Sequence, residues 1–304
     1  MKLHLAILLS VLSSSSAFTI PSLPKAHISL HANPTSSTFL TPTILNNLES
    51  VVGTTPFYAY SLPALQKAAS ETLAFPAAYG LTVRYAMKAS PTLAILQTFQ
   101  KAGLNIDASS VFEVERAIRA GFTYDQISLS TQELGEEFVS LAKKGVKVNC
   151  CSLSQLDRFG KAFPGGTCGV RINPGVGSGG FSGDTLGFSK TNVGGPSSSF
   201  GIWVGSLEDG TVQSIVAQHN LNVERIHTHI GSGSDPEIWK SVAQKSLSFA
   251  QLFPTVTTLN LGGGYKVGRN PGEMTTDLQE IGLPVKEAFE EFKAETGREV
   301  RRRD

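Results

Sequence analysis

The sequence is short of charge, of cysteine and of long apolar runs. Charged residues make up 17% of its 304 residues, which excludes a disordered acidic or basic chain. The 26 Lys and Arg balance 25 Asp and Glu, and a net charge of +1 gives no basic field for nucleic acid. The 3 cysteines, Cys150, Cys151 and Cys168, are too few for a disulfide framework, and no Cys/His spacing indicates a metal site. Their role stays open.

The N-terminal apolar stretch, Leu3 to Leu12, is too short to span roughly 30 Å of hydrocarbon. With Lys2 before it and small residues after it, residues 1–17 are typical of a cleavable signal peptide. Residues 18–45 are rich in Ser, Thr and Pro and resemble a transit peptide or linker, and the Ala17-Phe18 junction resembles a plastid-import cleavage site. We predict plastid localisation, with the secretory pathway as the alternative. Residues 46–304 then form one domain with no membrane attachment after processing.

Downstream of Ser61, short β-rich runs alternate with helix-length amphipathic segments. Such alternation predicts right-handed βαβ units and a parallel sheet. Polar residues or glycine follow the strands, and many strands contributing to one face favour a barrel over an open sheet. The predicted strands are residues 81–86, 104–107, 127–130, 146–149, 169–172, 223–230 and 256–261, and the residues at their ends are Lys88, Asp107, Ser130, Asn173, His229 and Gly262.

Lys88 and His229 each have a structural and a functional interpretation. Most lysines after strands are solvated, but a desolvated one keeps a neutral amine that forms Schiff bases. Alternation along a strand places His227 and His229 on the same side. They are interpreted as a pair of core histidines, as a pair of metal ligands or as the start of an anion-binding site. The Gly231-Ser-Gly233 turn that follows favours an anion.

Two further features concern binding groups. Gly262-Gly-Gly264 is either a flexible turn or a phosphate site, and a second glycine turn on the neighbouring strand favours phosphate. Asp107 could cap the next helix, but Ser109 and Ser110 are better caps. Arg171, inside a strand, then needs a buried acidic partner, for which Asp107 is a candidate. The Gly- and Ser-rich insertion 173–200 is too long for a plain loop and indicates function.

Taken in order on successive strands, these motifs resemble the fold-type III PLP-dependent decarboxylases, most closely the diaminopimelate decarboxylases. The similarity covers roughly Thr55 to Arg303. It rests on Tyr-Ala-Met-Lys88-Ala, Asp107-Ala-Ser-Ser110, Arg171-Ile-Asn-Pro-Gly, the run Thr191 to Gly201, His229-Ile-Gly-Ser232-Gly and Gly262-Gly-Gly264.

The resemblance implies an alanine-racemase-like PLP-binding barrel with pyridoxal 5′-phosphate as cofactor and no metal. It assigns catalysis to Lys88, which carries PLP, and to His229, which stacks on the pyridine ring. The implied cofactor-binding residues are Lys88, Asp107, His229, Gly231, Ser232, Gly262, Gly263 and Gly264, and the implied substrate-side residues are Arg171, Asn173, Phe200 and Gly201.

The implied activity is that of a carboxy-lyase converting meso-diaminopimelate to L-lysine and CO₂ in lysine biosynthesis, as a homodimer. Alternatives are a decarboxylase of ornithine, arginine or carboxynorspermidine, or a non-catalytic homologue. The family's Glu-Pro-Gly strand and C-terminal β domain do not follow Thr296-Gly-Arg-Glu-Val300. We therefore expect a truncated (β/α)₈ TIM-like barrel that lacks its last strand and has two unpaired edges. Such a chain would bind PLP poorly and decarboxylate negligibly.

Overall fold

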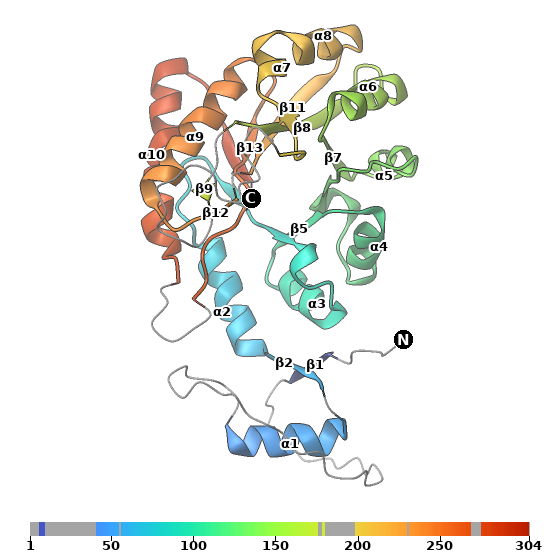
Figure 1. Cartoon of the computed structure of the whole chain (residues 1–304), viewed down its shortest axis with the longest axis vertical. Helices are drawn as coiled ribbons and strands as arrows, with labels where there is room; N and C mark the ends of the chain where they lie inside the picture. The colour runs from blue at the N-terminus through green and yellow to red at the C-terminus, as the bar shows by residue number, and fades with distance from the viewer. Residues whose placement is uncertain are drawn as a thin grey trace.

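The computed structural model describes residues 6–9, 41–54, 56–175, 178–179, 198–229, 231–268 and 275–303. Within these ranges a ring of parallel strands is surrounded by helices (Figure 1). A smaller unit lies apart from the ring, where β1 (Ala6–Leu9) pairs with β2 (Tyr58–Ser61) beside α1 (Pro42–Val52). Most of the predicted signal and transit segments lie outside the described residues.

The ring follows the order β3-β14-β13-β11-β8-β7-β6-β5-β4, and every neighbouring pair is parallel. β3 and β4 are consecutive pieces of one stretch, broken only at Val83, so the two ends of this order meet. The predicted α/β barrel and all the predicted strands are confirmed. Their bounds are β3 Leu81–Thr82, β4 Arg84–Ala86, β5 Asn105–Ala108, β6 Ile127–Ser130, β7 Lys147–Cys150, β8 Thr167–Asn173, β11 Asn222–Thr228, β13 Thr258–Asn260 and β14 Arg301–Arg303.

The last of these strands corrects the expectation of an open ring. β14 pairs with β13 through Arg301 and Arg302 and with β3 through Arg302 and Arg303. Arg298, just before it, donates hydrogen bonds to carbonyl oxygens between Ala250 and Val256, which joins the start of β14 to the end of α9 (Pro236–Gln251) and the segment after it. Three consecutive arginines carry no apolar strand signal, so the pattern did not reveal this strand. The two unpaired edges are therefore absent from the described ring.

Helices pack their apolar faces on the outside of the ring. For α3 the sequence pattern predicts a buried face of Leu93, Ile95, Leu96 and Phe99. The last three are buried, but Leu93, in the first turn, is 50% exposed. For α4 the pattern predicts a face of Phe112, Val114, Ala117 and Ile118. Val114 and Ala117 are fully buried, but Phe112 is 72% exposed. The remaining helices and short strands are α2 Leu62–Leu73, α3 Leu93–Lys101, α4 Val111–Arg119, α5 Phe138–Lys143, α6 Leu153–Ala162, β9 Ser178–Gly179, β10 Ile202–Trp203, α7 Gly205–Glu208, α8 Thr211–Gln218, β12 Gly231–Ser232, α9 Pro236–Gln251 and α10 Leu278–Thr296.

The interior of the ring is polar, although the outward side chains of the same strands are apolar. The Asn149 amide donates to the hydroxyls of Ser128 and Ser130, at 2.9 Å each, and its oxygen accepts from Arg225 at 3.4 Å. A Cβ at Gly169 would lie 1.9 Å from that oxygen, so glycine leaves room for the network. The alternation of polar and apolar residues in these strands thus separates a hydrogen-bonded interior from a helix-facing core.

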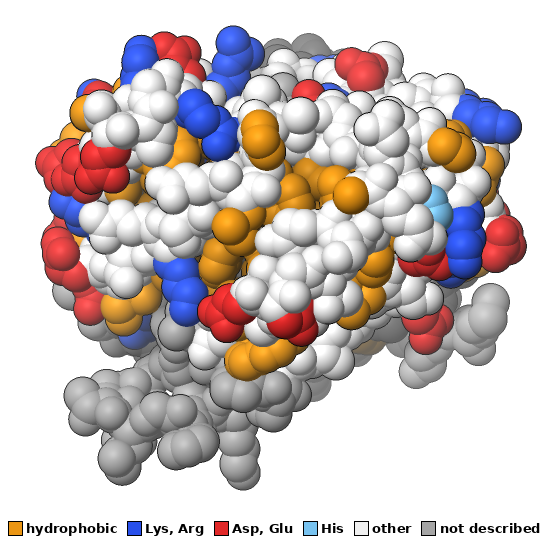
Figure 2. Space-filling model, turned by 90° about the horizontal axis from the view of Figure 1, so that it is seen from above, with side chains coloured by type: hydrophobic (Ala, Val, Ile, Leu, Met, Phe, Trp, Pro, Cys, Tyr) orange, Lys and Arg blue, Asp and Glu red, His pale blue; other side chains and the backbone are white. Residues whose placement is uncertain are grey.

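The surface carries no field of one sign on the face that Figure 2 shows. Lys and Arg side chains alternate there with Asp and Glu around the edge, and hydrophobic side chains lie mainly in recesses between them. None of the helices in the described ranges combines the length and apolarity that crossing a bilayer requires.

Candidate active site

Lys88 lies at the mouth of the ring, directly after the first strand. It sits in a 3₁₀ turn, Met87–Ala89, whose Met87 side chain is fully buried and anchors the turn. The side chain of Lys88 is exposed rather than desolvated. Its positive charge nevertheless lowers the pKa of Asp107, His227 and His229, so the ammonium group lies within electrostatic range of all three. The structure thus brings the predicted lysine to the predicted acid and imidazoles.

Asp107 is an acid with an unusual pKa. Burial raises the pKa of its carboxyl group to about 6, against the opposing attraction of Arg84, Arg171 and Lys88. Ser130 Oγ donates to Asp107 Oδ1 over 3.4 Å. Arg171 is therefore close to the acidic group that the sequence analysis named as its candidate partner.

The helix cap that could have occupied Asp107 is made by a serine. Ser110 Oγ accepts from the backbone N–H of Glu113 at 3.2 Å, and the Glu113 carboxylate accepts from the N–H of Ser109 at 2.6 Å. The prediction of serine capping is confirmed for Ser110. The Asp107 side chain is consequently available to the ring interior.

Ser130 is the hub of the polar groups beneath the mouth. Besides Asp107 and Asn149, its hydroxyl contacts His227 Nδ1 at 3.4 Å. Burial lowers the pKa of His227 well below its usual value, and Arg171, His229 and Lys88 lower it further. The sequence pattern predicts Ser130 at a strand end without a role, and it does not single out Asn149. The alternation of polar residues along the strands was the signal for both.

His229 lies against the triple-glycine turn. Burial lowers the pKa of His229 to about 4, with Arg171 and Lys88 adding to the effect, so its imidazole is neutral at pH 7. A Cβ at Gly262 would lie 2.4 Å from His229 Nδ1, and Gly262 has a φ of +70°. The turn can therefore reach the imidazole only because residue 262 is a glycine. This places the second histidine beside the predicted anion site.

The two predicted glycine turns meet. Gly233 N–H donates to the carbonyl oxygen of Gly264 at 3.0 Å, and Gly233 forms a parallel bridge with Tyr265. Gly263 and Gly264 are exposed, and a Cβ at Gly263 would meet no atom within 4 Å. Gly231 and Ser232 form β12, which pairs with β9 from the long insertion. The side chain of Ser232 lies outside the description.

The predicted substrate-side residues also come together, at the end of β8. The guanidinium of Arg171 lies over the ring of Phe200, 5.1 Å from its centroid. Asn173 Nδ2 donates to the carbonyl oxygen of Ser198 at 3.4 Å, which ties the two ends of the insertion together. Gly201 has a φ of +85°, and its Cβ would lie 3.0 Å from the backbone N of Asn173. Residues 176–177 and 180–197 of the insertion lie outside the description.

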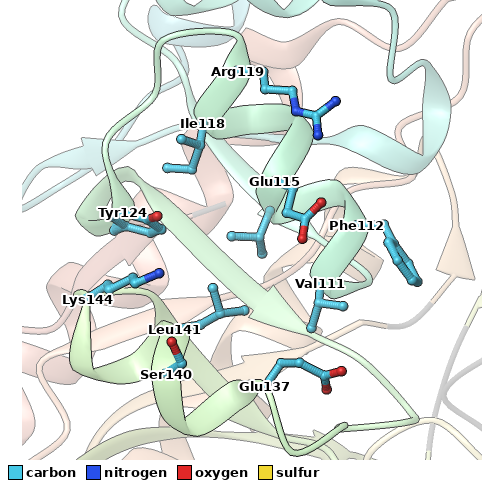
Figure 3. A pocket seen from close by; sticks show the side chains of 11 residues that line it. Val111, Phe112, Glu115, Ile118, Arg119, Tyr124, Glu137, Ser140, Leu141 and Lys144 are labelled. Atoms are coloured by element: carbon cyan, nitrogen blue, oxygen red, sulfur yellow. The ribbon is translucent and has the colours of Figure 1, made fainter.

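A hollow of about 450 Å³ lies elsewhere, on the outer side of the ring between α4 and α5 (Figure 3). Val114 and Leu141 are among its apolar lining residues, and Glu115, Arg119 and Lys144 are among its charged ones. It contains none of the predicted site residues.

The cysteines are free and buried. Burial raises the pKa of Cys151 to about 11, against the attraction of nearby Arg171. A hydrogen bond from Cys168, followed by burial, raises the pKa of Cys150 well above its usual value. Cys151 thus faces the site and Cys150 the helix-side core, as opposite faces of a strand predict. Among the described residues, no three His, Cys, Asp or Glu side chains gather as metal ligands would.

Comparison with known proteins gives a consistent set of relatives. Residues 64–301 match the family described as pyridoxal-dependent decarboxylase, pyridoxal binding domain. The diaminopimelate decarboxylase of Streptomyces coelicolor is 33% identical over 231 residues, which are 72% of this chain and 49% of the relative. That of Escherichia coli is 31% identical over 212 residues, 65% of this chain and 46% of the relative. The chain spans about half the length of the curated relatives it matches.

Solved structures show the same likeness. One diaminopimelate decarboxylase superposes with a TM-score of 0.75 at 27% identity, covering 88% of this chain and 62% of that one. The arginine decarboxylase of Paramecium bursaria Chlorella virus superposes with a TM-score of 0.66 at 21% identity, covering 86% of this chain and 66% of that one. At that identity the second match concerns the fold alone.

Proposed function

We propose, since the chain belongs to the pyridoxal-dependent decarboxylase family and matches its pyridoxal-binding domain, that it binds PLP at the mouth of its ring. The observation that carries the proposal is the convergence of an amine, a neutral imidazole and two glycine turns. Lys88 and His229 lie close enough for the lysine charge to lower the histidine pKa, and Gly262 packs on that histidine. Three otherwise weak motifs therefore form a single site.

The residues present fit this cofactor. The Lys88 amine suits an aldehyde, and the exposed backbone of Gly263 and Gly264 offers N–H groups to a phosphate with no Cβ in the way. His229, neutral at pH 7, can lie flat against an electron-poor ring without the repulsion that an imidazolium would bring. Each of these groups comes from a different strand end, so the ring itself sets their spacing.

The chemistry that bound PLP supplies is an electron sink for the bond pair left when a carboxylate departs as CO₂. The chain contributes orientation and proton control. Lys88 would hold the aldehyde through Nζ, and its amine would be the group that carries a proton near the substrate Cα. Arg171 supplies a positive charge on the substrate side, and its packing on Phe200 restricts where that charge lies. Asp107 partly offsets the charges of Lys88 and Arg171.

The substrate we propose is meso-diaminopimelate, converted to L-lysine and CO₂. The relatives of Streptomyces coelicolor and Escherichia coli are diaminopimelate decarboxylases at about 30% identity, whereas the arginine decarboxylase likeness concerns only the fold. Decarboxylation of arginine, ornithine or carboxynorspermidine is the second candidate. The full-length protein is proposed to act as a homodimer.

Borohydride reduction in the presence of PLP, followed by peptide mapping, tests the cofactor proposal. We expect the label on Lys88 and its loss in Lys88→Ala. Lys101→Ala, which changes an exposed lysine at the end of α3, is the matched control and should leave the label in place. A label that persists in Lys88→Ala would refute the assignment. The predicted weakness of PLP binding rested on the family's Glu-Pro-Gly strand and β domain as well as on an open ring. The pairing of β14 removes only the open ring from those grounds, so weak binding stays a prediction.

Release of CO₂ tests the substrate proposal separately. Diaminopimelate, arginine and ornithine would each be supplied to unreduced, PLP-loaded protein from a preparation in which a separate borohydride-treated sample is labelled at Lys88. We expect release from diaminopimelate in preference to the other two. Preference for arginine or ornithine would favour the second candidate, and no release would indicate a PLP-binding chain without activity.

Plastid import is proposed from the N-terminal sequence alone. Its support is the short apolar stretch Leu3 to Leu12 followed by the Ser-, Thr- and Pro-rich residues 18–45. A fluorescent fusion to residues 1–45 should enter plastids, and deletion of residues 1–17 should abolish entry. Appearance of the fusion in the medium would favour the secretory alternative.

A further inference from the structure

Arg302 is a charged side chain buried in the last ring strand, with only 3% of its surface exposed. Its guanidinium lies over the ring of Phe75, 3.8 Å from the centroid, and its Nη2 donates to the Tyr265 hydroxyl at 2.5 Å. A buried guanidinium is costly unless such contacts compensate it. These contacts therefore define where both the arginine and the tyrosine lie.

Tyr265 connects this arginine to both glycine turns. It directly follows Gly264 and forms a parallel bridge with Gly233 of the other turn. Its ring stacks on Trp239, with 4.7 Å between centroids, and the Trp239 indole N–H donates to the carbonyl oxygen of Gly233 at 3.4 Å. Tyr265 thus lies between the two turns, with Arg302 bound to its hydroxyl.

The triple-glycine turn needs such support. Gly262 and Gly264 have φ values of +70° and +101°, and Gly263 has no neighbour within 4 Å of a Cβ position. Glycine backbone is the freest in the chain, so the directions of its N–H groups are not fixed locally. A site whose donors are already oriented binds an anion more tightly than one that must order them.

We propose that Arg302 is a positioning residue that orients the triple-glycine turn for the phosphate group of PLP, acting through the Tyr265 hydroxyl. The inference rests on the proposed function, because it concerns the same cofactor site. The effect of Arg302 is confined to the phosphate end, since Lys88 and the aldehyde lie at a different strand end.

Comparison of PLP with pyridoxal, which lacks only the phosphate, tests the inference. Both bind the same lysine through the same aldehyde, so the ratio of their dissociation constants isolates the phosphate contribution. In Tyr265→Phe and in Arg302→Met we expect PLP affinity to fall about tenfold, as for the loss of one hydrogen bond to a charged group, and pyridoxal affinity to change less than about twofold.

Matched variants distinguish a positioning role of Arg302 from a general loss of protein stability. Arg301→Met changes an exposed arginine of the same strand and should leave both affinities within about twofold of the wild type. The double variant Tyr265→Phe/Arg302→Met should lose no more PLP affinity than either single variant, because both act by one route. Tyr265→Phe decides the question if Arg302→Met fails to fold.

Two other outcomes overturn the inference in distinguishable ways. Equal loss of PLP and pyridoxal affinity, with wild-type protein labelled at Lys88, would refute the positioning role and leave the proposed function intact. Wild-type protein that binds neither compound would refute the proposed function and this inference with it.

Discussion

At the scale of single residues, the mouth of the ring combines a carboxyl group and imidazoles whose pKa values are shifted by the same burial in opposite directions. The pKa of Asp107 rises to about 6, and that of His229 falls to about 4. Low dielectric penalises whichever form is charged, which is the ionised acid and the protonated base. At pH 7 the imidazole of His229 is therefore neutral, whereas Asp107 is still mostly ionised and offsets part of the charge of Lys88 and Arg171.

Asp107→Asn tests this balance through stability. In the unfolded chain the carboxyl pKa is about 4, so the folded state holds the proton more tightly, and this group's contribution falls as pH rises from about 4 to about 6. His229 acts oppositely, because its lowered pKa makes stability fall as pH drops from about 6.5 to about 4. Removing Asp107 leaves the histidine effect unopposed. We expect Asp107→Asn to lose more stability on acidification than the wild type, by up to about 3 kcal/mol.

Urea denaturation between about pH 4 and about pH 7 measures this difference. Glu115→Gln, on the exposed side of α4, is the control with the same loss of a carboxylate and should follow the wild-type curve more closely. Parallel curves for wild type and Asp107→Asn would contradict the raised pKa.

Substitution by alanine at two neighbouring glycines of the triple turn should have different effects on stability and on PLP binding. Gly262→Ala forces a Cβ to within 2.4 Å of His229 Nδ1 at a φ of +70°, so we expect destabilisation by about 1–3 kcal/mol. Gly263→Ala meets no atom within 4 Å and should fold like the wild type. If a phosphate lies on this turn, Gly263→Ala should still weaken PLP binding. Thermal unfolding and PLP titration measure the two effects, and wild-type PLP affinity in Gly263→Ala would place the phosphate elsewhere.

At the scale of elements, the site depends on where each strand ends and how the next helix begins. Ser110 caps α4 and leaves Asp107 to the ring, and β10 pairs with the end of β8 so that Phe200 lies under Arg171. The insertion is therefore part of the site through its two described ends. The position of Phe200 under Arg171 thus depends on the backbone pairing of β10 with β8 as much as on side-chain chemistry.

The cap gives a prediction at this scale. Ser110→Ala removes the acceptor for the Glu113 N–H and should lower the free energy of unfolding by about 1 kcal/mol. Ser109→Ala, one residue earlier, keeps the backbone N–H that donates to Glu113 and should cost less than about 0.5 kcal/mol. Chemical denaturation compares them, and equal losses would show that the hydroxyl of Ser110 is not the cap.

At the scale of the whole molecule, the ring closes through two short strands. β14 has 3 residues and β3 has 2, whereas the strands on the opposite side, β6 and β7, have 4 each and are almost wholly buried. Arg298 and Arg302 hold this seam through side chains rather than through a long hydrogen-bond ladder. Arg302 of β14 also contacts Tyr265, which directly follows the triple-glycine turn. The stability of this seam and the order of the glycine turn are therefore linked.

Hydrogen exchange should reveal the seam. Local opening requires fewest broken contacts where the ladder is shortest, so amides of β3 and β14 should exchange faster than those of β6 and β7. Mass spectrometry of peptic fragments measures this, with α1, outside the ring, as an early-exchanging reference. Equal protection around the ring would show that the arginine contacts make the seam as stable as the long strands.

The sequence by itself determined the barrel, its strand positions and nearly all of the residues at its mouth. Those features follow from local periodicity and from the rule that parallel strands of a ring end on one face. The burial of Ile95, Leu96 and Phe99 and the serine cap of α4 are likewise local, and they were predicted. The exposure of Phe112 was not predicted, because periodicity identifies the apolar face of a helix but does not show how far the neighbouring element covers that face.

Tertiary structure alone decided the closure at β14, the hub at Ser130 and the contact of Arg302 with Tyr265. Each depends on strands far apart in the chain, and their side chains look ordinary until the ring brings them together. The shifted pKa values belong here too, since burial within the assembled ring is their largest cause for Asp107, His227 and His229. Motifs name candidate groups, but only packing sets the dielectric and the distances that make them a site.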